Sequence, residues 1–119
     1  MGTTATYSGG CHCGKVRYEV TTDLAYVMDC NCSICSKKAT VLTFVPEDQF
    51  KLLSGADSLT SYKFNKHVIE HTFCGTCGIG SFAKGKKPDG TAMAAVNVRC
   101  LDGVDLASLD VKHVDGKSI

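Results

Sequence analysis

Eight cysteines give this 119-residue chain most of its capacity for chemistry. Seven of them fall into three clusters: Cys11 with Cys13, Cys30 with Cys32 and Cys35, and Cys74 with Cys77; Cys100 stands alone. Thiolates at such short spacings are typical ligands of Zn²⁺, whereas in an oxidising compartment they would form disulfides. The first residues carry neither the basic nor the apolar segment of a secretory signal. We therefore expect a cytoplasmic protein with reduced, metal-binding thiols.

The first and last clusters together supply four thiolates. Cys74 and Cys77 are two residues apart and are followed by Gly78, a turn that lets both sulfurs face one point. Cys11 and Cys13 would point to the same face of an extended chain. Four thiolates fill a tetrahedral shell and leave no position for a substrate. We therefore predict a structural zinc site formed by Cys11, Cys13, Cys74 and Cys77.

Two other interpretations of these clusters stay open. A redox pair at Cys74 and Cys77 would suit a thioredoxin-like βαβ setting, which the surrounding pattern does not resemble. An iron–sulfur cluster would be expected to follow a different cysteine spacing. If the metal is structural zinc, its apparent binding free energy of about 10–16 kcal/mol would rival the net stability of a whole domain.

The middle cluster places three thiolates within six residues, with no fourth cysteine adjacent in sequence. Three protein ligands are typical of a catalytic zinc, which keeps one position open for water or substrate. We therefore predict a second, catalytic zinc on Cys30, Cys32 and Cys35, tuned by the backbone amides of Ser33 and Ile34. The alternative is a second structural site completed by Cys100, His67 or His71.

Several polar residues lie close to these cysteines in sequence. His12 stands between two predicted ligands and is expected to point away from the metal. Lys37 or Lys38 is a candidate for binding the carboxylate of a substrate, as is Arg99, which is spaced to share a strand face with Asn97. Phe44 is a candidate wall of a substrate pocket, and Cys100 reads as a small buried hydrophobe.

Short strands are expected to position the cysteines. Alternating or β-branched segments separated by turn residues predict strands at 15–20, 25–28, 41–45, 50–53, 59–64, 68–73, 79–82 and 93–98. Only residues 46–49 and 101–109 have helical patterns, and both segments are short. The pattern predicts a mainly β, small antiparallel fold.

Composition limits the other functions that the chain could have. With 119 residues, one domain spanning 1–119 is expected, and its core is small because there is no Trp. No apolar run approaches the roughly 18 residues of a membrane helix. The formal net charge of +1 makes nucleic acid an improbable partner, and seven bound thiolates would make the chain slightly acidic.

Three segments resemble the glutathione-dependent formaldehyde-activating enzyme family. They are 9–14 around Cys11 and Cys13, 30–35, and 71–78 around Cys74 and Cys77. Residues 96–102 resemble the centromere protein V-like branch of this family. The resemblance spans about residues 7–103.

This resemblance implies a small zinc-binding β-tent fold with a structural zinc on the four outer cysteines and a catalytic zinc on the triplet. It further implies a carbon–sulfur lyase of the S-(hydroxymethyl)glutathione synthase type, which reversibly adds the thiol of glutathione, or a similar thiol, to formaldehyde or a related small aldehyde. The competing hypothesis is a non-catalytic, zinc-stabilised module that binds a protein or nucleic acid.

Overall fold

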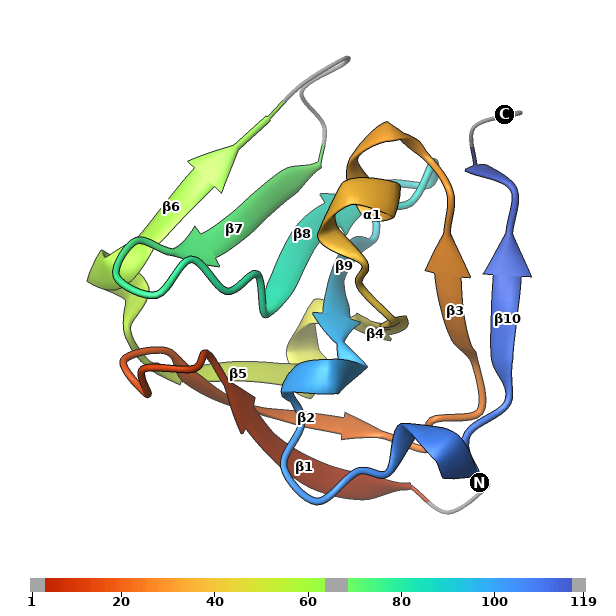
Figure 1. Cartoon of the computed structure of the whole chain (residues 1–119), viewed down its shortest axis with the longest axis horizontal. Helices are drawn as coiled ribbons and strands as arrows, with labels where there is room; N and C mark the ends of the chain where they lie inside the picture. Colours follow the sequence, from red (N-terminus) through yellow and green to blue (C-terminus); the bar gives the residue numbers. More distant parts are fainter. Residues whose placement is uncertain (1–3, 64–68, 117–119) are drawn as a thin grey trace.

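The structure, a computed structural model, describes residues 4–63 and 69–116 and contains two β-sheets (Figure 1). The small sheet has the order β1-β2-β5 and comprises Ala5–Gly10 (β1), Arg17–Thr22 (β2) and Phe50–Ser54 (β5). The large sheet has the order β10-β3-β4-β9-β8-β7-β6. Its strands are Val27–Cys30 (β3), Leu42–Pro46 (β4), Leu59–Tyr62 (β6), Glu70–Cys74 (β7), Phe82–Lys86 (β8), Ala92–Asn97 (β9) and Val111–Val114 (β10).

The predicted mainly β class is confirmed, and most predicted strands overlap an observed one. The strand predicted at 79–82 is wrong in position, because β8 begins only at Phe82. The expected helix at 101–109 is reduced to a 3-10 turn at Leu106–Ser108, whereas residues 47–49 do form a 3-10 turn. Residues 64 and 68, at the ends of two predicted strands, lie outside the described residues.

Two strands and the α-helix were not predicted: β1, β10 and Ser33–Lys38 (α1); the 3-10 turns Ala56–Ser58 and Val98–Cys100 were also not predicted. β1 ends in two glycines, of which Gly9 is needed because a Cβ there would lie 2.8 Å from the Cys100 carbonyl oxygen. β10 runs parallel to β3, so the sheets are not purely antiparallel as expected. No described helix has the length and apolar character needed to span a membrane.

A cluster of aromatic rings joins the two sheets. Tyr18 is fully buried, with its ring centroid 5.0 Å from that of Phe50 and 5.7 Å from that of Phe82. The Tyr18 hydroxyl donates to the Ser81 carbonyl oxygen at 3.3 Å. The buried thiols of Cys11 and Cys74 belong to the same apolar cluster. The core therefore extends directly to two of the predicted metal ligands.

Replacing Tyr18 by Ala should destabilise the fold by about 3–5 kcal/mol, because it opens a large cavity where the two sheets meet. The free energy of unfolding from urea titrations measures this loss. Leu53→Ala is the matched control, since Leu53 is 50% exposed and its truncation should cost no more than about 0.5 kcal/mol. Equal losses in the two variants would contradict this description of the core.

Candidate metal centres

The four outer cysteines converge on one point. The sulfur atoms of Cys11, Cys13, Cys74 and Cys77 all lie within 4.8 Å of one another. The Sγ–Sγ distance is 3.6 Å between Cys11 and Cys13 and 3.7 Å between Cys13 and Cys74. Tetrahedral Zn–S bonds of about 2.3 Å correspond to sulfur–sulfur distances of about 3.8 Å. The geometry of this group, hereafter the tetrad, therefore fits zinc.

Each pair of tetrad cysteines lies in a tight turn that directly follows the buried end of a strand. The Cys11 amide donates to the Val16 carbonyl at 3.1 Å, and the Val16 amide donates back to Cys11 Sγ at 3.4 Å. Cys74 is held in the same way. Its amide donates to the Ile79 carbonyl, and its sulfur accepts from the Thr76 amide at 3.4 Å. Cys11 and Cys13 converge through a turn rather than through the extended chain that we expected.

Backbone amides aimed at the sulfurs favour their thiolate forms. The Ile79 amide, followed by that of Cys13, lowers the pKa of Cys77 to about 6. The amides of Cys77 and Thr76 likewise lower the pKa of Cys74. For Cys13, the Lys15 amide lowers the pKa, but burial and the neighbouring thiols outweigh it and raise the value to about 11. The loops thus supply the N–H···S bonds that a thiolate-bound metal requires.

The second group, hereafter the triplet, brings together the sulfur atoms of Cys30, Cys32 and Cys35 within 4.8 Å of one another. Cys30 ends β3, Cys32 is the N-cap of α1, and Cys35 lies inside that helix. Among the described residues, neither Cys100 nor His71 joins this group. His67, the other candidate for a fourth ligand, lies outside the described residues.

The start of α1 supplies the amides that face the triplet. The Cys32 amide donates to Cys30 Sγ at 3.5 Å. Burial opposes ionisation of Cys32, but the Cys35 amide, the thiols of Cys35 and Cys30 and the Ile34 amide together outweigh it and lower the pKa of this thiol. Of the two donors expected here, Ile34 takes this role, whereas Cys35 acts in place of Ser33. Burial, followed by the thiol of Cys32, raises the pKa of Cys35 to about 12.

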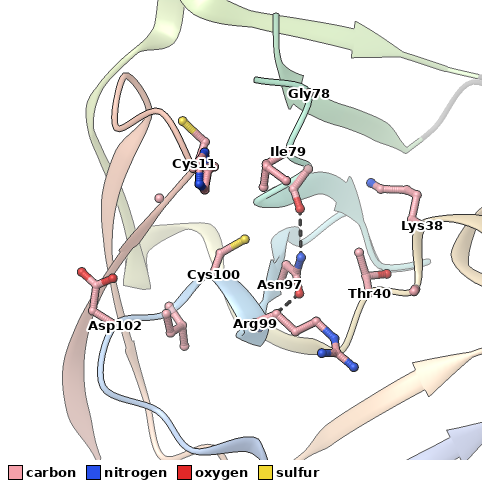
Figure 2. Close-up of a pocket in the computed structure, with 14 residues that line it drawn as sticks. Cys11, Lys38, Thr40, Gly78, Ile79, Asn97, Arg99, Cys100 and Asp102 are labelled. Atoms are coloured by element: carbon pink, nitrogen blue, oxygen red, sulfur yellow. Dashed lines mark hydrogen bonds between the residues drawn. The ribbon is translucent and has the colours of Figure 1, made fainter. Parts of the chain in front are cut away.

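Two cavities lie on either side of a shared wall, and one of them is lined by the triplet. A polar cavity of about 540 Å³ lies between the tetrad and α1 (Figure 2). An apolar cavity of about 250 Å³ contains the triplet itself. Both are lined by Lys38, Thr40, Gly80 and Asn97.

Most of the polar candidates from the sequence face the polar cavity, which His12, Lys38, Asn97, Arg99 and Cys100 all line. Figure 2 shows the Lys38 amine pointing into the cavity, while the Arg99 guanidinium extends away from the Cys100 thiol. The half-buried Lys38 packs against Gly80, where an added Cβ would lie 3.0 Å from Lys38 Nζ. Lys37 is exposed and lines neither cavity.

The contacts of Asn97 and Cys100 are mainly structural. The Asn97 amide side chain donates to the Gly80 carbonyl at 3.1 Å and accepts from the Arg99 amide at 3.2 Å. Asn97 ends β9 and Arg99 lies in the 3-10 turn Val98–Cys100, so the two do not lie on one strand as expected, although both line the polar cavity. Cys100 is half-buried, and burial raises the pKa of its thiol.

Comparison with known proteins identifies the family. Residues 6–113 match the family model described as glutathione-dependent formaldehyde-activating enzyme. The chain belongs to this family. A putative glutathione-dependent formaldehyde-activating enzyme of Talaromyces marneffei is 31% identical over 80 residues, which are 62% of this chain and 42% of that protein. The chain thus covers less than half of that relative's length.

A solved structure agrees with this assignment. The crystal structure of a Rhodobacter sphaeroides protein superposes with a TM-score of 0.80 at 31% sequence identity, covering 90% of this chain and 99% of that one. This member of the formaldehyde-activating enzyme family therefore shares its fold with the Rhodobacter sphaeroides protein over nearly its whole described length.

In this family member, the C-terminal strand closes against the triplet. Val114 of β10 pairs with Cys30, and its carbonyl accepts from the Asn31 amide at 3.1 Å. The Asn31 side chain donates to Asp115 at 2.8 Å. The backbone of Gly116 follows, so close that an added Cβ would collide with Cys30 Sγ. No sequence motif predicts the contacts between residues 114–116 and the triplet, because they join segments more than 80 residues apart.

Replacing Gly116 by Ala should therefore displace Cys30 and lower metal binding at the triplet while leaving the tetrad loaded. Metal content per chain, measured by atomic emission after dialysis, should fall by about one equivalent. Gly85→Ala is the control, because its added Cβ would meet Ile69 at an ordinary 3.4 Å. An unchanged metal content in Gly116→Ala would show that the C-terminal segment does not constrain the triplet.

Proposed function

We propose that this chain is a zinc-dependent carbon–sulfur lyase that reversibly adds a thiol, glutathione or a similar one, to formaldehyde or a related aldehyde. The observation that carries the proposal is the triplet: three converging sulfurs that open onto a cavity, with no fourth described ligand. Membership of the family supports the same chemistry. The proposal treats residues 1–119 as one domain, acting in the cytoplasm where thiols remain reduced.

Two zinc ions per chain are proposed, with different roles. The tetrad would hold a structural ion, because four sulfurs saturate the metal. The triplet, Cys30, Cys32 and Cys35, would hold a catalytic ion whose bound substrate thiol has a lowered pKa. The amides of Cys35 and Ile34 favour the thiolate form of Cys32, the form in which it would be a ligand.

The chain's own residues position and shield the reactants. Lys38 lies where the two cavities meet and can bind a carboxylate of the thiol substrate. Apolar walls around the triplet exclude water, which would otherwise compete with the thiol for the aldehyde. In the addition, a bond forms between the thiol sulfur and the aldehyde carbon. The aldehyde oxygen takes up the proton that the thiol releases and becomes a hydroxyl.

Cys32→Ser and Cys74→Ser should separate the two metal roles. Cys32→Ser should leave a folded protein with about one zinc fewer and no turnover of glutathione with formaldehyde. Cys74→Ser should unfold the chain, because Cys74 is fully buried and belongs to the core cluster. Circular dichroism and metal analysis measure both effects. If both variants unfold alike, two structural sites and a non-catalytic binding module are favoured.

Lys38→Met should raise the KM for glutathione about tenfold or more. The Met side chain has a similar length but lacks the charged hydrogen-bond donor of Lys38. The kcat should change little, because the carboxylate is bound equally before and during the reaction. Lys37→Met is the matched control on the exposed side of α1, and its kinetics should equal those of the unmodified protein. Identical effects of the two substitutions would remove Lys38 from the substrate site.

A further inference from the structure

The apolar cavity at the triplet is larger than a one-carbon substrate needs. Its volume is about 250 Å³, or about eight times the roughly 30 Å³ that a water molecule occupies in the liquid. A metal on the triplet and the sulfur of the bound thiol would occupy part of this space, and formaldehyde, with two heavy atoms, would fill little of the remainder. Besides the cysteines, the walls are mainly apolar: Met28, Ile34, Leu42, Phe44, Ile69, Phe82, Ala83 and Ala95.

The apolar surface continues beyond the triplet. A further cavity of about 280 Å³ shares Phe44, Ile69, Ala83 and Ala95 with the first and extends to Met93. Its far side is lined by Lys84, Lys86 and Lys87. Phe44 and Ile69 are 40% and 49% exposed, although both are large apolar side chains beside the candidate metal site. An apolar group bound on them would remove this surface from water.

The polar and apolar parts of the site lie on different sides of the shared wall. Lys38 lines both cavities, but His12, Arg99 and Cys100 line only the polar one. The carboxylates of a thiol such as glutathione therefore fit the polar side. The group attached to the aldehyde carbon would then bind on the apolar side.

We propose that the aldehyde substrate carries a straight apolar chain of about four to six carbons, which binds along Phe44, Ile69 and Ala95. This inference rests on the proposed function and narrows its aldehyde. The reaction is R–SH + R′–CHO giving R–S–CH(OH)–R′, in which R′ is the chain. The thiol proton moves to the former carbonyl oxygen, and no other reactant is required.

The first test varies the aldehyde at constant glutathione. The kcat/KM, divided by the uncatalysed rate for each aldehyde, should rise about fourfold per methylene from acetaldehyde to hexanal. A flat or falling series, with formaldehyde turned over well, would overturn this inference while sustaining the proposed function. Absence of turnover with every aldehyde would count against the proposed function itself, and the binding series below then decides the inference.

The second test measures binding without turnover. S-methyl-, S-propyl- and S-hexylglutathione carry the chain where the adduct carries it but cannot react. Calorimetry on the zinc-loaded protein should show affinity rising about fourfold per methylene. The same chains on thioglycolate control for recognition of glutathione. Chain-length dependence in either series supports the apolar site, and its loss in both overturns it.

Two variants locate the chain. Ala95→Leu should fill the cavity and lower the ratio of hexanal to formaldehyde kcat/KM at least tenfold. Ile69→Ala should lower the same ratio a few-fold without threatening the fold, because Ile69 is 49% exposed. Ala107→Leu, on an exposed 3-10 turn remote from the cavities, is the matched control. If neither cavity variant changes the ratio relative to this control, the chain does not bind there.

Discussion

Convergence of the four tetrad sulfurs is the constraint on which the rest of the structure depends. Four thiolates within 4.8 Å of one another would repel strongly, so a cation bound among them would stabilise this arrangement. Cys11 follows β1 in the small sheet, whereas Cys74 ends β7 in the large one. A metal bound at this point would therefore join the two sheets at one edge of the core, where Tyr18 and the aromatic rings around it already connect them.

The tetrad also shapes the candidate catalytic site. The chain that leaves Cys77 runs through Gly78 and Ile79 to Gly80, and these residues line the polar cavity. Gly80 contacts Lys38 from α1, and its carbonyl accepts from Asn97 of β9. One short segment thus connects the tetrad, the helix that carries Cys35 and the wall shared by the cavities. Loss of a metal bound at the tetrad would disturb the triplet through this segment.

The sequence revealed which cysteines cluster, because each pair or triplet is local and its spacing limits where the sulfurs can point. The same spacing could not reveal β10, whose pairing with β3 joins residues 111–114 to 27–30 in parallel. It also missed α1, since a six-residue helix of Ser, Ile, Cys and Lys has no amphipathic period to detect. Its amides face Cys32, so the helix and the sulfur cluster favour each other. This mutual dependence arises from contacts in the folded chain, so the sequence pattern alone could not predict it.

The apolar surroundings of the triplet bear directly on the chemistry. Aldehydes add water as well as thiols, and water is far more abundant, so a site that favours the thiol adduct benefits from excluding water. The side chains of Leu42, Phe44 and Phe82 offer water no hydrogen-bond partner, although Thr40, His71 and Asn97 also line this cavity. In the proposed reaction, the thiol would be bound by the metal and by Lys38. The low local dielectric also strengthens the N–H···S bonds at Cys32. A chain on the aldehyde would complete the exclusion of water by occupying the remaining apolar volume, so substrate size and reaction outcome become linked.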